Sequence, residues 1–279
     1  MDRSARVEYL NEPLRPAPVT GGPNLETAPR TMVKVELHTH TADDPVDRIP
    51  YTIFQLIDRA VSLDYGALAV TLHDFQLDVR PFVPYAAERG LVLIPGVERT
   101  IEGRHVLLLN FAGGTEDVRT FDDLARLKSR TPGLVVAPHP FFPAFACLWG
   151  ELDRHADLFD AVERNAMFTS TLDFNRRAER WATRHSKPVV GNCDVHQLRQ
   201  LGTTYSLVDA LPEADAICAA IAAGRVRVES RPLTWVEATA IMTTMVLSHA
   251  RPHSHHDQFT PKIAAIDVDD SSTPAARRL

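Results

Sequence analysis

Residues 33–40 of the chain read VKVELHTH, in which aliphatic and polar side chains alternate before two histidines. This alternation predicts a β-strand that ends just before the histidines. Residues i and i+2 of an extended segment point to the same side, so His38 and His40 can reach one metal ion together. A second pair with this spacing, Asp194 and His196, follows another short aliphatic run. The stretch therefore predicts a strand that leads into a metal site.

The succession of a short aliphatic run, a polar residue and a stretch of helical periodicity recurs along the chain. Strands are predicted over residues 33–37, 67–71, 91–94, 105–111, 134–137, 158–162, 189–192, 205–208 and 226–228. Helices are predicted over residues 52–64, 81–89, 121–130, 171–185 and 213–223. Such alternation is typical of parallel strands joined by crossover helices. Seven or more units of this kind predict an α/β fold whose sheet closes, or nearly closes, into a barrel.

Side chains that can bind metal follow almost every predicted strand. They are His38, His40, His73, Asp74, Glu98, His139, Glu163, Asp194 and His196. The C-terminal ends of parallel barrel strands open on one face, so residues scattered in sequence converge there. A shell of imidazoles and carboxylates without thiolates suits Zn²⁺, Mn²⁺ or Fe²⁺. The order of strands and ligands therefore predicts a cluster of divalent metal ions at that face.

The composition excludes several classes of protein. The chain has 279 residues, of which 44% are hydrophobic, enough to bury a full core. A net charge of −6 provides no basic field for a nucleic-acid backbone, so we expect no stable nucleic-acid complex. No apolar run approaches the roughly 20 residues that cross a bilayer, and we expect a soluble cytoplasmic protein without a membrane partner. The three cysteines are too widely spaced for a disulfide framework.

The two ends of the chain differ from its middle. Residues 1–30 contain five prolines and no periodic apolar pattern, which is typical of a flexible leader. Residues 251–279 mix prolines and histidines with acidic residues and serines, and this composition predicts a flexible tail. Residues 31–250 are then the barrel domain. An apolar stripe that begins at Trp235 predicts a last helix that packs on the barrel, with a homo-oligomer as an alternative use of this surface.

Five motifs occur in an order that resembles one protein family. They read ELHTHT (36–41), AVTLHD (69–74), PGVE (95–98), PHP (138–140) and GNCDVH (191–196). In these motifs the chain resembles the PHP (polymerase and histidinol phosphatase) family over about residues 33–230. The resemblance implies a distorted (β/α)7 barrel, similar to a TIM barrel, with the metal cluster at the C-terminal ends of its strands. It also implies two or three divalent metal ions and, most often, phosphoester hydrolysis.

Carried over residue by residue, the resemblance implies a set of metal ligands: His38, His40, Asp44, His73, Glu98, His105, His139, Asp194 and His196. Glu98 is then the carboxylate that bridges two ions. The family's usual Ser-Asp-Gly is absent from the loop after His40, where Asp43, Asp44 and Asp47 are the alternatives. We choose Asp44, with Asp47 second. His105 differs from the other ligands because it lies at the start of its predicted strand.

A metal cluster of this kind can hold a bridging hydroxide and stabilise the charge of an in-line displacement at phosphorus. The predicted catalytic residues are Glu98, His73 and Asp74. His73 and Asp74 are alternatives to a metal-bound water as the acid that protonates the leaving group. Guanidinium groups recognise phosphate. The candidates for this role, each near a ligand-bearing strand end, are Arg99, Arg164 and Arg199.

These residues predict a metal-dependent hydrolase of phosphoesters that acts on a small phosphomonoester or nucleotide through a metal-bound hydroxide. Two alternatives stay open: a 3′-5′ exonuclease-type phosphodiesterase acting on single-stranded nucleic acid, and a non-catalytic metal-binding module. A covalent route through Cys193 is disfavoured. In an extended segment Cys193 points to the opposite side from Asp194, so we expect its thiol in the core.

Overall fold

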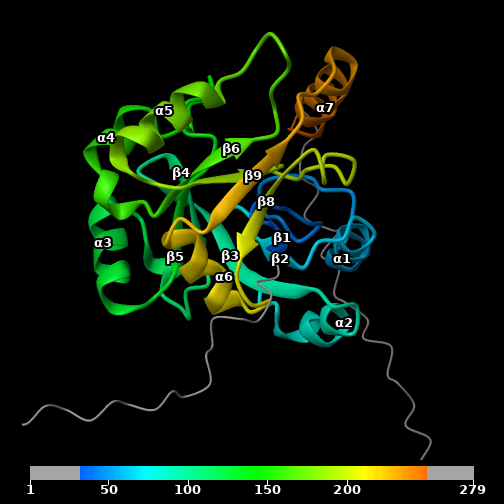
Figure 1. The fold of residues 1–279 in the computed structure, drawn as a ribbon, viewed down its shortest axis with the longest axis horizontal. Helices are drawn as coiled ribbons and strands as arrows, with labels where there is room; N and C mark the ends of the chain where they lie inside the picture. Colours follow the sequence, from blue (N-terminus) through cyan, green and yellow to red (C-terminus); the bar gives the residue numbers. More distant parts are fainter. Residues whose placement is uncertain (1–31, 250–279) are drawn as a thin grey trace, which may run out of the picture. The chain divides into compact units, whose positions relative to one another are not determined.

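The computed structural model describes residues 32–249, so the predicted leader and tail lie outside the described residues. The strands are β1 Met32–Glu36, β2 Ala67–Val70, β3 Val92–Ile101, β4 Arg104–Leu109, β5 Leu134–Ala137, β6 Ala161–Asn165, β7 Val189–Asn192, β8 Thr204–Asp209 and β9 Val226–Ser230. The α-helices are α1 Ile53–Val61, α2 Val83–Ala87, α3 Phe121–Arg130, α4 Gly150–Arg154, α5 Asn175–His185, α6 Ala214–Ala222 and α7 Trp235–His249 (Figure 1). Short 3₁₀-helices cover Arg80–Phe82, Thr115–Asp117 and Ala156–Leu158.

The strands form one sheet that curls until its two edges meet. Their order is β7-β6-β5-β4-β3-β2-β1-β8-β9, and the edge strand β7 lies against β8 and β9 at the other edge. At this junction the Gly191 N–H donates to Ser206 Oγ at 2.9 Å. A Cβ at Gly191 would lie 2.7 Å from Val228 and 2.8 Å from the carbonyl oxygen of Tyr205, so only glycine fits there. The predicted class, an α/β barrel similar to a TIM barrel, is confirmed.

The strand directions differ from the all-parallel prediction. β1, β2 and β3 are parallel, as are β5, β6 and β7. β4 is antiparallel to both its neighbours, β8 is antiparallel to β1, and β9 is antiparallel to β8. β3 and β4 form a hairpin in which Glu102 and Gly103 have φ of 49° and 76°, as a type I′ turn requires. The barrel therefore has nine strands within residues 32–249 rather than seven βα units.

Helices cover the outside of the sheet with their apolar faces. α1 begins after Thr52 in a capping box, because the Thr52 hydroxyl accepts from the Gln55 N–H and the Gln55 side chain accepts from the Thr52 N–H. Its Leu56 and Ile57 are fully buried, and Trp181 of α5 is buried on the other side of the barrel. This packing fixes the strand ends that carry the site. Within residues 32–249, none of the helices is long and apolar enough to span a membrane.

Candidate metal centre

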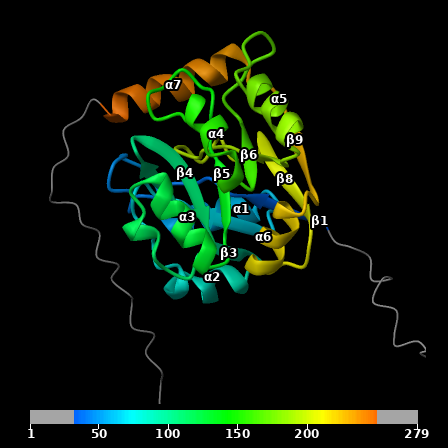
Figure 2. The same cartoon turned by 90° about the vertical axis from the view of Figure 1, so that its left-hand side faces the viewer.

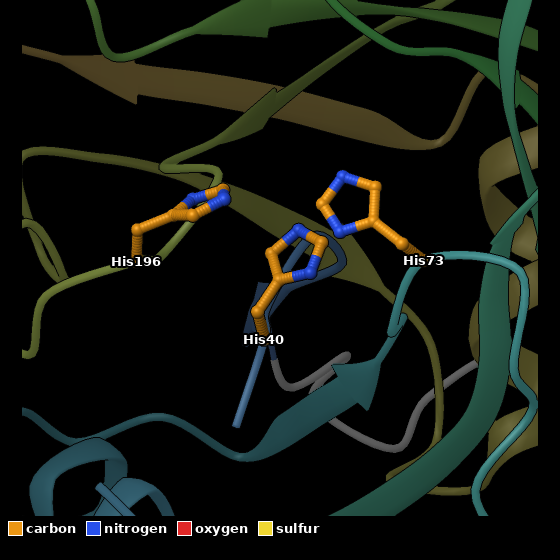
Figure 3. Close-up of side chains that lie close together, drawn as sticks. All are labelled: His40, His73 and His196. Atoms are coloured by element: carbon orange, nitrogen blue, oxygen red, sulfur yellow. The ribbon is translucent and has the colours of Figure 1, made fainter. Parts of the chain in front are cut away.

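Eight of the proposed ligands converge at one end of the barrel. They are His38, His40, His73, Glu98, His105, His139, Asp194 and His196. Figure 3 shows His40, His73 and His196 turned toward one another from three separate segments. The ring centroid of His40 lies 4.4 Å from those of both His73 and His196. The strand ends thus gather residues that are more than 150 positions apart in the sequence.

His105 joins this cluster although it begins its strand. β4 runs antiparallel to β3 and β5, so the first residues of β4 lie at the same end of the barrel as the last residues of β5. His105 Nδ1 is 2.7 Å from Glu98 Oε1 as a result. The reversed strand explains how a residue at a strand start can face ligands at strand ends.

Glu98 lies at the centre of the cluster and is almost completely buried. Its Oε1 faces His105 and His139, the latter at 3.2 Å from Nε2. Its Oε2 lies 3.1 Å from His38 Nε2 and 3.2 Å from His73 Nε2. The two oxygens of one carboxylate therefore face imidazoles on different sides. This arrangement fits a carboxylate that bridges two cations.

Three buried polar atoms at the centre make no hydrogen bond among the described residues and face only other ligand atoms of the cluster, at 3.1 to 3.4 Å. They are Nε2 of His38, Nε2 of His40 and Oδ1 of Asp194. All three lie within 4.8 Å of one another. Buried polar atoms without a partner are costly, and a cation among them would satisfy all three. The donor set of two imidazoles and a carboxylate fits a divalent metal ion.

Buried carboxylates orient the histidines from behind. Glu163 Oε2 lies 2.8 Å from His38 Nδ1, and Asp44 Oδ2 lies 2.8 Å from His40 Nδ1. A carboxylate that accepts the Nδ1 proton leaves Nε2 available for an ion and makes it more basic. Both residues thus hold the imidazoles in the orientation that metal binding needs.

The loop after His40 places its acidic residues beside different histidines. Asp44 accepts from the His73 N–H at 3.0 Å as well as facing His40 Nδ1, so it lies behind the histidines. Asp47, our second choice, has Oδ2 at 2.7 Å from His196 Nε2. Asp44 therefore contacts His40 and His73 on the side away from the centre of the cluster, whereas Asp47 contacts His196, and both stay candidate residues of the site.

The histidines and carboxylates of the cluster shift one another's pKa values. Burial would lower the pKa of His38, but Asp194, Glu98 and Glu163 outweigh burial and raise it well above the ordinary value. A similar balance raises the pKa of His73 to about 9. Burial would raise the pKa of Glu98, but the surrounding histidines hold it well below its usual range. The buried carboxylates therefore require positive charge, which either protons on imidazoles or metal ions can supply.

Two cluster residues hold unusual backbone conformations. His139 has φ of 28° and Asp194 has φ of 51°, in the left-handed region that side chains with a Cβ rarely adopt. Glu163 Oε1 accepts the His139 N–H at 3.2 Å and helps to hold this conformation. Such strain concentrates at functional sites because the surrounding structure must maintain it.

Asp74 and Arg99 are turned away from the cluster. Asp74 Oδ1 accepts from the Thr100 N–H at 2.8 Å and pairs with Arg99 at 3.2 Å. Arg99 is buried and donates to the carbonyl oxygens of Val118 and Glu116 at 2.8 and 3.0 Å. Arg99 follows Glu98 in β3, so their side chains point to opposite faces. The structure therefore does not bring these two side chains to the cluster.

Arg164 and Arg199 also lie outside the cluster. Arg164 follows Glu163 in β6 and points to the opposite face, where it contacts Ser230 at 3.0 Å and pairs with Glu179. Arg199 donates to the carbonyl oxygen of Ala240 in α7 at 3.0 Å. In the structure none of these three guanidinium groups lies at the cluster, since strand alternation holds Arg99 and Arg164, and contacts to α7 hold Arg199, elsewhere.

Two further residues at the site were missed as functional residues in the sequence. Glu36 is fully buried, accepts from the backbone N–H of His38 at 3.2 Å and of Cys193 at 3.0 Å, and burial raises its pKa to about 8. Cys147 Sγ lies 3.4 Å from His139 Nδ1. Glu36 could have been found from its place two residues before His38, but Cys147 lies in a loop without a signal.

Cys193 lies in the core as expected. Its thiol is fully buried and donates to the carbonyl oxygen of Thr204 at 3.0 Å. Burial raises the pKa of this thiol well above its usual range. Cys193 is therefore no thiolate nucleophile at neutral pH.

The fold and the cluster together define an α/β barrel with a buried centre of histidines and carboxylates. Residues 173–226 match a family model described as PHP-associated. This match confirms, for that stretch, the family resemblance inferred from the motifs. It includes Asp194 and His196, while the other cluster residues precede it. No curated protein matches the chain.

Solved structures with a similar fold have low sequence identity to the chain. PsfC from Pseudomonas syringae is 19% identical with a TM-score of 0.58, and the match covers 78% of this chain and 98% of PsfC. Endonuclease Q in complex with a 27-mer duplex carrying an abasic lesion is 15% identical with a TM-score of 0.50, covering 76% of this chain and 67% of the endonuclease. At these identities the similarities show a shared fold.

Proposed function

We propose that the chain is a metal-dependent phosphoesterase that hydrolyses a small phosphomonoester. The observation that carries this proposal is the position of Glu98, whose two oxygens face imidazoles on both sides. One shared carboxylate between two groups of histidines is the arrangement needed to hold neighbouring cations. Divalent ions, when bound, lower the pKa of water and neutralise charge that develops on phosphoryl oxygens.

The described residues offer four overlapping groups of three ligands. These are His40-His73-His196, His38-His40-Asp194, His38-Glu98-His139 and His73-Glu98-His105. Each imidazole offers one atom, so groups that share a histidine cannot be filled together. The groups His38-Glu98-His139 and His73-Glu98-His105 have no histidine in common and share Glu98, so they support two ions with this carboxylate between them. Asp194 lies 3.4 Å from His40 Nε2 and 3.3 Å from His196 Nδ1, beside these two groups. We propose two or three ions of zinc, manganese or iron.

The proposed reaction is the hydrolysis of a phosphate ester by water. The oxygen of water attacks phosphorus, the bond from phosphorus to the ester oxygen breaks, and the products are an alcohol and inorganic phosphate. Asp74 does not protonate the leaving oxygen in this proposal, because Thr100 and Arg99 occupy its carboxylate. His73 lies among the ligands, so we assign the proton of the alcohol to solvent water.

The replacement of Glu98 by Gln tests this proposal. The amide removes the negative charge that two groups of ligands share, so we expect loss of at least one metal ion and of turnover. Metal content by elemental analysis, phosphate release and circular dichroism measure ion binding, activity and folding separately. A folded E98Q variant with full metal content and full turnover would contradict the assignment.

The substrate panel should include a phosphomonoester, a single-stranded oligonucleotide and a duplex with an abasic site. We expect phosphate release from the monoester. The absence of Arg and Lys contacts to the cluster among the described residues supports a small substrate over a polynucleotide backbone. Cleavage of either oligonucleotide without release of phosphate from the monoester would favour the nuclease alternative.

A further inference from the structure

A cavity of about 540 Å³ opens directly beside the metal cluster, and its size is that of a ligand-binding pocket. His139 and Asp194 of the cluster form one end of it. α7 forms the opposite wall, and Figure 2 shows the start of this helix, in orange, beside the loop between β6 and α5. A group bound at the cluster would therefore have this cavity next to it.

The lining of the cavity is apolar and aromatic. Phe142, Phe168, Phe174 and Trp235 contribute rings from three different segments. The ring of Phe142 lies 6.4 Å from that of His139 and 5.4 Å from that of Phe174, centroid to centroid. An aromatic wall thus continues from a metal-cluster imidazole into the cavity. Such a wall favours packing against a flat apolar group.

Charged side chains are nearly absent from this lining. Among the described lining residues, the ionisable ones are His139, Asp194 and Cys147, and all three lie at the end near the cluster. The side chain of Asn165, which also lines the cavity, is occupied because its Nδ2 donates to Glu163 and its Oδ1 accepts from the Met167 N–H. Three threonines also line the cavity, of which Thr169 accepts from the Leu172 N–H and Thr239 donates to the carbonyl oxygen of Trp235. A substrate with carboxylates or further phosphates would find no lysine or arginine among the described lining residues.

The mouth of the cavity exposes large apolar side chains that the fold holds in place. Trp235 and Met242 of α7 are 57% and 49% exposed. The start of α7 is fixed because the Leu233 N–H donates to the carbonyl oxygen of Phe168 at 2.8 Å. Gln197 donates to the carbonyl oxygen of Ile241 at 3.2 Å and fixes the middle of the helix. These two hydrogen bonds therefore hold the apolar mouth in place beside the cluster.

We propose that the substrate is a phosphomonoester of an apolar, aromatic alcohol, whose ring packs in this cavity while its phosphate lies at the metal cluster. This inference rests on the proposed phosphoesterase function and adds the substrate class. An aromatic ring matches the rings of Phe142, Phe168 and Trp235, and it leaves no polar group unpaired in an apolar lining. The hydrolysis is the one given above, and the aromatic alcohol leaves with a proton from water.

Two esters with similar alkyl leaving groups test the substrate class. We expect kcat/KM for 3-phenylpropyl phosphate to exceed that for n-propyl phosphate by about tenfold or more, because one leaving group buries a ring and the other does not. A non-hydrolysable pair, 3-phenylpropylphosphonate and propylphosphonate, gives the same comparison by calorimetry without turnover. We expect the phenyl compound to bind about tenfold more tightly.

Variants in α7 test whether the cavity lining causes the preference for the phenyl compound. Trp235→Ala and Met242→Gln should each reduce the preference for the phenyl compound severalfold in both assays. Val236→Ala is the matched control, because Val236 is 79% exposed on the same helix and lies outside the cavity lining. Its preference should equal that of the parent. Light scattering of each variant shows whether oligomeric state changes.

The outcomes separate the two proposals. If no ester is hydrolysed but the phenylphosphonate binds preferentially and W235A loses this preference, the proposed reaction fails while the pocket assignment stands. Equal kcat/KM and equal affinities within each pair would overturn the substrate class. Preferred hydrolysis of a nucleoside 5′-monophosphate over 3-phenylpropyl phosphate would overturn it as well. So would variants that dissociate an oligomer without changing the preference, since the apolar mouth would then be a subunit contact.

Discussion

Asp44 makes contacts in several directions from one carboxylate. Its Oδ1 accepts from the N–H groups of Val46 and Asp47 at 2.9 and 2.8 Å, and its Oδ2 faces His40 and the His73 N–H. These contacts fix the loop that carries Asp47 and orient two imidazoles at once. A single side chain behind the ligands therefore controls the shape of a large part of the cluster.

Asp44→Asn should weaken metal binding while the fold is kept. Both oxygens of Asp44 accept hydrogen bonds, whereas the amide of asparagine has one acceptor oxygen, no charge and an NH2 group that would face a donor. Loss of such an orienting group typically costs about 10- to 100-fold in metal affinity. Competition with a chelator measures this affinity. Asp43→Asn is the control, because Asp43 is exposed and its carboxylate contacts the Thr41 hydroxyl at 3.1 Å. Equal metal affinity in both variants would show that Asp44 does not orient the ligands.

The buried carboxyl group of Glu36 predicts a pH dependence of stability. Burial raises its pKa to about 8 in the folded chain. A raised carboxyl pKa contributes stability that is complete below the unfolded value, near 4.5, and is lost as the pH rises to about 8. Glu36→Gln has no proton to lose. Between pH 6 and pH 9, the free energy of unfolding should therefore fall by about 3 kcal/mol less in E36Q than in the parent.

Urea denaturation of the metal-free protein at these two pH values measures the difference. Glu237→Gln is the control. Contacts with Arg231 and Thr234 lower the pKa of Glu237 to about 2, outside the tested interval. Its unfolding free energy should change with pH as that of the parent does. Parallel pH dependence in E36Q and the parent would mean that Glu36 is ionised throughout.

At the scale of elements, barrel closure depends on the absence of a side chain at Gly191. β7 meets β8 and β9 there, with Tyr205 and Val228 too close for a Cβ. Gly191→Ala should therefore destabilise the protein by about 1–3 kcal/mol, the usual cost of forcing an extra methyl group into packed structure. Gly113→Ala is the control because nothing lies within 4 Å of a Cβ at that position. Thermal unfolding that is equal for both variants would contradict this account of closure.

The sequence predicted where strands lie better than which way they run. All nine predicted strands correspond to observed ones, because short aliphatic runs mark strands in either direction. The reversal of β4 had only a weak signal in Glu102-Gly103, because glycine suits the second position of a type I′ turn but the first position usually holds Asn, Asp or Gly. The position of His105 at the cluster was hard to predict for the same reason, since it depends on the reversed direction of β4.

The positions of side chains were predictable where strand alternation decides them. Arg99 directly follows Glu98 in a strand, and a period of two already places it on the opposite face. The choice between Asp44 and Asp47 was not predictable in this way, because both lie in an irregular loop whose path depends on its hydrogen bonds. The strand-end ligands needed no such detail, and eight of the nine proposed ligands meet.

At the scale of the whole molecule, the described site depends on a limited part of the chain. Its ligands and orienting residues lie between Glu36 and His196, and the cavity extends this range to Thr243. We therefore expect a protein of residues 31–250 to fold and to bind metal ions with the stoichiometry of the full chain. Circular dichroism and elemental analysis of both proteins check this. Loss of an ion, or a large fall in turnover with the fold intact, would place a terminal segment in the active site.

Different parts of the chain form the metal cluster and the cavity wall that α7 provides. The proposed metal ligands come from segments that end at His196, whereas α7 begins at Trp235. In the proposed reaction, substitutions along α7 thus change which alcohol is accepted without altering any proposed metal ligand. This division makes the last described helix the natural place to diversify a library, and it gives evolution a route to new substrates that leaves the hydrolytic chemistry untouched.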